Sequence, residues 1–92
     1  MAYTVKTYKL KELKPSEAVK FLLNHHFELT HREGTHIYFL KEVEGQKYMP
    51  QVIDNNKCIY WPNVEEMIRK SGIPKEEWIE ELCPKIYRRL KK

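Results

Sequence analysis

Four histidines between residues 25 and 36 are the candidates for proton-transfer chemistry in this 92-residue chain. A neutral imidazole titrates near pH ~6.5, so it can accept or release a proton at cellular pH. His36 directly follows the Gly34-Thr35 pair, which is typical of a turn, and it begins a segment rich in β-branched and aromatic residues. A lone histidine in a strand is more often structural, so its position on the sheet is decisive.

The same histidines do not predict a metal site. His25 and His26 are adjacent, so their side chains point in different directions and suit the polar C-terminus of a helix. Side-chain alternation places His31 on the same side as Phe27 and Leu29, opposite His36. No cysteine or aspartate completes a ligand set, and we expect no metal and no cofactor.

The elements that position His36 follow from the hydrophobic pattern. Apolar residues recur at helical spacing after Pro15, which predicts a first helix with Ser16 as its N-cap. Residues 27–31, 35–41 and 47–53 alternate as strands do, and the short turns between them predict an antiparallel meander. Pro50 cannot donate to a ladder, which favours an edge position for the third strand.

The second half predicts helices. Asn63 and Glu66 stand at capping-box positions, with Val64, Met67 and Ile68 expected on the inner face. Gly72 suits the C′ position of this helix. A further helix should begin at Pro74 and end or kink at Pro84. The predicted fold class is α+β, a three-stranded antiparallel sheet with helices on one face.

Strand parity gives His36 its environment. Ile37 and Phe39 are the natural core pair of the second strand. Because side chains alternate, His36, Tyr38 and Leu40 then fall on the opposite, uncovered face. An imidazole on that face is accessible to a substrate.

Composition indicates one folded domain spanning residues 1–92, with a charged fraction of 33% and a net charge of +4. Residues 1–14, a predicted N-terminal extension with strand-like alternation, carry +3, and residues 85–92 carry +5, which leaves −4 for residues 15–84. The basic ends suit either phosphate attraction or a solvated helix end. With no long apolar run, no leader and two cysteines that lack metal-type spacing, we expect a cytoplasmic protein with packed, reduced thiols.

Residues 16–82 resemble the HicA toxin family. The resemblance lies in the first helix, in Gly34-Thr35-His36 at the start of the second strand, and in the run from Met67 to Trp78. It implies a double-stranded-RNA-binding-domain-like core over residues 15–83, followed by a basic end at 84–92. It also implies a metal-independent messenger-RNA endonuclease of a type II toxin–antitoxin system, with a HicB-like antitoxin as partner. His36 corresponds to the family's catalytic histidine and Gly34 to its glycine.

The chain departs from that family at three places. Thr35 replaces a serine and keeps its hydroxyl, and His25-His26 stands where many members have Asn-Gly. The segment after Pro50, residues 51–53, lacks the histidine that many members carry there.

The resulting hypothesis is an RNA endonuclease with His36 as general acid and base. The Gly34-Thr35 turn would position the substrate, Tyr38 would stack on a base, and Arg32 and Lys47 would contact phosphate. Two alternatives are a non-catalytic RNA-binding module on the same fold and a protein-interaction domain that uses the exposed sheet face.

Overall fold

The computed structural model describes residues 8–55 and 57–90, and it confirms an α+β fold. Within these ranges no helix is long and apolar enough to cross a membrane. The elements in chain order are α1 (Pro15–Asn24), β1 (Glu28–Glu33), β2 (His36–Val43), β3 (Gln46–Tyr48), β4 (Gln51–Ile53), α2 (Trp61–Ser71), α3 (Lys75–Leu82) and α4 (Pro84–Leu90).

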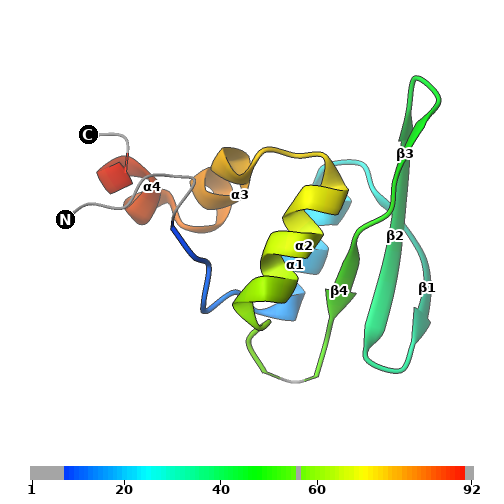
Figure 1. Ribbon diagram of the computed structural model, residues 1–92, viewed down its shortest axis with the longest axis horizontal. Coiled ribbons are helices and arrows are strands. Elements are labelled where there is room, and N and C mark those ends of the chain that lie inside the picture. The colour runs from blue at the N-terminus through cyan, green and yellow to red at the C-terminus, as the bar shows by residue number, and fades with distance from the viewer. Residues whose placement is uncertain (1–7, 56, 91–92) are drawn as a thin grey trace.

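Strand β2 is the centre of the sheet and pairs antiparallel with all the other strands (Figure 1). The predicted third strand is split at Met49-Pro50 into β3, which pairs with the far half of β2, and β4, which pairs with its first half. Pro50 lacks an N–H, but its carbonyl accepts the Phe39 N–H at 3.1 Å. The split strand therefore lies at the sheet edge, as Pro50 predicts.

A β-bulge in β1 reverses the faces expected for its second half. The β1–β2 register shifts between Leu29 and His31, so Thr30 is an extra residue in the ladder. His31 consequently pairs with Tyr38 on the open face, whereas strict alternation placed it on the opposite side. That expectation was wrong because one inserted residue moves every following side chain to the other face.

The helices cover the other face of the sheet. Helix α1 contacts β1 and β4, and α2 contacts β4, whereas α3 and α4 extend away from the strands (Figure 1). Phe21 of α1 stacks on Trp78 of α3, with ring centroids 3.8 Å apart. Val64, Met67 and Ile68 are buried, which confirms the predicted inner face of α2.

Residues 8–14, part of the predicted N-terminal extension, contribute two side chains to the core. Leu10 and Leu13 are buried, and the Leu13 carbonyl accepts the Ile59 N–H at 2.8 Å. Residues 8–14 form no strand, and residues 1–7, which carry most of the strand-like pattern, lie outside the described ranges.

Two predicted helix starts are displaced by one or more residues. Helix α1 begins at Pro15 with Lys14 at the N-cap, and the Glu17 carboxylate accepts the Lys14 N–H at 3.0 Å. Helix α2 begins at Trp61 after Tyr60, so Asn63 lies within its first turn. In each case a proline at the first or second position has the φ angle of a helix and starts it before the polar residue.

The predicted helix ends are confirmed. Gly72 is the left-handed residue after α2, with φ at +72°, and α3 stops just before Pro84. Pro84 then begins α4, whose Tyr87 hydroxyl donates to the Glu76 carboxylate at 2.7 Å. The basic end is therefore attached to α3 by a side-chain hydrogen bond.

Gly72→Ala should destabilise the fold more than Gly45→Ala. Both glycines have positive φ, which costs an alanine roughly 1–2 kcal/mol. At Gly72 an added Cβ would also lie 2.5 Å from the Tyr48 ring, whereas nothing lies within 4 Å of Gly45. Overpacking should add about 1–3 kcal/mol to the loss for Gly72→Ala. Urea denaturation measures both, and equal losses would contradict the contact with Tyr48.

The two cysteines are free, and they should differ in reactivity. Cys58 is exposed rather than packed, because it lies in the irregular segment before α2. Burial and, to a lesser degree, the nearby Glu17 carboxylate raise the pKa of the Cys83 thiol. Because the thiolate is the nucleophile, Cys83 should react with a disulfide reagent more slowly than Cys58 at about pH 8 and accelerate at higher pH. Similar rates in the native state would contradict this, and similar rates in denaturant serve as the control.

Candidate functional site

His36 lies half-buried at the start of β2, on the sheet face that the helices leave open. Its neighbours Ile37 and Phe39 are 5% and 1% exposed, so the predicted core pair is confirmed. In the ladder His36 pairs with Glu33 of β1 and with Ile53 of β4. The imidazole is thus held between two strands but retains access from one side.

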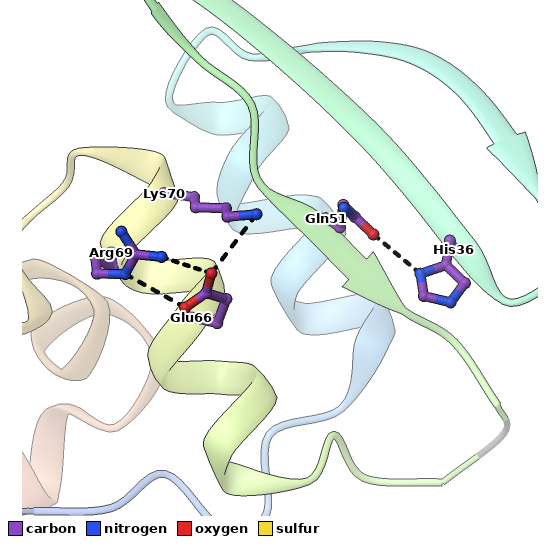
Figure 2. A network of polar contacts seen from close by, with 5 residues as sticks. All are labelled: His36, Gln51, Glu66, Arg69 and Lys70. Atoms are coloured by element: carbon purple, nitrogen blue, oxygen red, sulfur yellow. Dashed lines mark hydrogen bonds and ion pairs between the residues drawn. The ribbon is translucent and has the colours of Figure 1, made fainter.

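The His36 imidazole is anchored by Gln51. Its Nδ1 lies 3.0 Å from the Gln51 Oε1, across the β2–β4 pair (Figure 2). An amide oxygen can only accept, so this contact is a hydrogen bond in the tautomer whose proton is on Nδ1. In the neutral ring Nε2 is then the nitrogen with a lone pair, and it can accept a proton from a substrate hydroxyl. Gln51 belongs to the segment where the resemblance led us to expect a histidine.

Three rings form an aromatic row across the open face, composed of His31, Tyr38 and His36. His31 stacks on Tyr38 with centroids 4.3 Å apart and planes 10° apart, and Tyr38 lies 6.3 Å from His36. The bulge residue Thr30 fixes this arrangement, because its hydroxyl donates to the Tyr38 carbonyl at 3.2 Å. His31 is a member that the sequence did not predict, since the bulge has no clear signal in residue types.

A small hollow of about 190 Å³ adjoins Gln51 at the boundary between β4 and α2. It is lined by Gln51, Ile53, Asn63, Glu66, Met67 and Lys70. Glu66 accepts from Arg69 at 2.6 Å and lies 3.6 Å from the Lys70 ammonium (Figure 2). The hydrogen bond from Arg69 lowers the pKa of Glu66, so this carboxylate remains ionised between the two cations.

Lys70 lines the same hollow as Gln51, and Arg69 shares its partner Glu66; the sequence did not single out either cation. Their spacing from Glu66 shows that they form ion pairs along α2. It does not show that this turn of α2 lies beside β4. That placement depends on the packing of Val64 and Met67 into the core.

The predicted phosphate contacts Arg32 and Lys47 lie elsewhere. Arg32 pairs with Ile37 and so faces the helix side, where its guanidinium lies 3.3 Å from the Asp54 carboxylate. Lys47 pairs with Glu42, six residues beyond His36, which is roughly 20 Å along the strand at about 3.3 Å per residue. The structure brings neither side chain to His36.

The backbone carbonyls of the Gly34-Thr35 turn, beside His36, both accept hydrogen bonds. Gly34 has φ of +61°, and its carbonyl accepts from the Arg32 Nε at 3.1 Å. The Thr35 carbonyl accepts the Asp54 N–H at 2.7 Å. These contacts fix the conformation of the turn, and the side chain of Thr35 is exposed.

His25, which follows α1, contacts side chains of both α1 and α3. Its ring stacks on Phe21 at 4.2 Å, and its Nε2 lies 2.8 Å from the Glu81 carboxylate of α3. Within residues 8–55 and 57–90, no three histidine, cysteine or acidic side chains gather in a way that could hold a metal ion.

Comparison with protein-family models, with curated proteins and with solved structures finds no match to this chain.

The anchoring of His36 predicts its tautomer. When the His36 imidazole is neutral, the Nδ1–H tautomer should dominate. Gln51→Leu should remove that preference because leucine offers no acceptor. Gln51→Glu keeps an acceptor and should retain it. Long-range ¹H–¹⁵N spectra of the imidazole distinguish the two tautomers, with His26 as an internal reference. A wild-type spectrum in which Nδ1 is unprotonated would contradict the proposed contact.

Proposed function

We propose that this protein is a metal-independent endoribonuclease of the HicA type, with His36 as its general base. The observation that carries the proposal is the half-buried His36 on the open sheet face, with its Nδ1 3.0 Å from the Gln51 Oε1. A base for RNA cleavage needs this combination of a fixed ring and an accessible lone pair.

The proposed reaction is an attack within the RNA chain. Nε2 of His36 takes the proton of a ribose 2′-OH, and the 2′-oxygen forms a bond to the adjacent phosphorus. The bond from phosphorus to the 5′-oxygen of the next nucleotide breaks, and that oxygen takes a proton from water or from the His36 imidazolium. The products are a 2′,3′-cyclic phosphate and a free 5′-hydroxyl, so the atoms and the proton balance without a redox partner.

Substrate contacts in this proposal come from both sides of His36. The aromatic row offers the Tyr38 and His31 rings for stacking on an unpaired base. Lys70 and Arg69 lie on the Gln51 side, where a phosphate could exchange with Glu66 as their partner. Arg32 and Lys47, which the sequence favoured for phosphate contact, have no place in this arrangement.

A HicB-like antitoxin is the partner that this proposal implies. An adjacent reading frame encoding such a protein would support it.

A non-catalytic RNA-binding module is the second candidate. It is favoured by the His31–Tyr38 stack, which offers a base-binding surface that does not depend on proton transfer. It differs from the first candidate in one respect, because RNA binding would occur without cleavage and would survive replacement of His36.

His36→Ala should reduce the cleavage rate of single-stranded RNA about 10²–10⁴-fold, because general base catalysis contributes that much to proton-transfer steps. The measurement is the initial rate on a labelled RNA in the presence of EDTA. His26→Ala is the matched control, since it removes an imidazole outside the site, and it should cleave at the wild-type rate.

The outcomes separate the two candidates. Equal cleavage by wild type and His36→Ala would refute a catalytic role for this residue. RNA binding by both proteins without cleavage by either would replace the endonuclease with the RNA-binding module. Circular dichroism of His36→Ala confirms that a loss of activity is not a loss of fold.

A further inference from the structure

Tyr60 is an unusually exposed aromatic residue next to the candidate site. Its side chain is 68% exposed, although it lies directly before α2 in a segment anchored by the buried Ile59. The neighbouring Trp61 ring is already covered by the Lys9 ammonium, 4.0 Å from its centroid. The Tyr60 ring is tilted 55° from Trp61 at 6.4 Å and thus presents its own surface to solvent.

Tyr60 lines a hollow of about 390 Å³ whose walls combine apolar residues, among them Ile53, Ile59 and Trp61, with cationic and amide side chains. The polar side chains around it are those of Lys11, Asn55, Lys57 and Asn63. Among the described residues, those that line this hollow include two lysines and no carboxylate. Asp54, in the same loop, has its carboxylate 3.3 Å from Arg32 instead. The lining therefore favours an anionic ligand that also carries hydrogen-bonding edges.

The hollow adjoins the smaller one beside Gln51, because Ile53 and Asn63 line both. Ile53 lines this hollow and also the smaller one that contains Gln51 and Lys70. In the sheet the same residue pairs with His36. A polymer with its reacting phosphate at His36 can therefore extend past Ile53 and the end of β4 toward Tyr60.

We propose that the Tyr60 hollow is a nucleotide subsite for single-stranded RNA, flanking the cleavage position. One base stacks on the Tyr60 ring, and Lys11 and Lys57 contact its phosphates. The amides of Asn55 and Asn63 contact the polar edge of that base. This inference rests on the proposed function, because it assigns a neighbouring nucleotide of the same substrate. Two lysines, two amides and no carboxylate among the described lining residues favour this anionic ligand over an apolar protein segment.

The test measures binding rather than cleavage. The probe is a fluorescein-labelled 2′-O-methyl RNA of about ten nucleotides, a length within the site sizes of single-strand-binding proteins. It lacks the 2′-OH and cannot be cut, so anisotropy reports affinity alone. Tyr60→Ala should weaken binding about tenfold, which is typical of the loss of one base–aromatic stack. Tyr60→Trp should bind within about twofold of wild type, because it keeps a stacking surface.

Charge and position provide the matched controls. The double variant Lys11→Ala/Lys57→Ala should weaken binding and reduce its dependence on salt concentration, because fewer counterions are released. Val43→Ala removes an exposed apolar side chain at the far end of β2 and should leave the affinity unchanged.

The results distinguish the subsite from the proposed function. Equal binding by wild type and Tyr60→Ala, or no binding of the probe at all, would overturn the subsite and leave the cleavage role of His36 to its own assay. Weaker binding by Tyr60→Ala, together with no His36-dependent cleavage, would support the subsite and overturn the endonuclease.

Discussion

The burial of Ile37 and Phe39 on one face of β2 is the constraint on which the rest of the structure depends. These side chains are 5% and 1% exposed, and burying each contributes about 1.5–3 kcal/mol. A register slip of one residue would lose both contributions and force His36 and Tyr38 into the helix side. His36 and Tyr38 therefore lie on the open face because the side chains next to them in the strand, Ile37 and Phe39, are buried in the core. All the other strands pair with β2, so this choice also sets the faces of β1 and β4.

The bulge at Thr30 interrupts the alternation of side chains along β1 and changes which side chains lie on the open face. It moves His31 onto the Tyr38 ring and directs Arg32 to Asp54 on the opposite side. The face near His36 therefore gains an aromatic stack and loses a cation. Helix α2 lies beside β4 at the sheet edge, and its Lys70 lines the same hollow as Gln51 (Figure 2).

Gln51 holds the His36 imidazole through a hydrogen bond from β4. Its own position follows from Pro50, which interrupts the third strand and lets β4 pair with the first half of β2. The resemblance to HicA-like toxins draws attention to His36 but leads one to expect a histidine in the segment that holds Gln51. An amide at this point cannot exchange protons as an imidazole does, so it serves to orient His36.

The sequence alone determined the α+β class, the meander, the ends of α2 and α3, and the sheet face on which His36 lies, because each depends on local residue types or on strict alternation. It misplaced the starts of α1 and α2, where proline preceded the polar residue expected to cap the helix. It also misassigned His31, because an inserted bulge residue leaves the alternation of apolar and polar types nearly unchanged. Only the tertiary structure decided which residues lie beside His36 and Gln51. Those contacts join residues distant in the chain, and their proximity follows from how α2 packs against β4, which no local pattern of residues encodes.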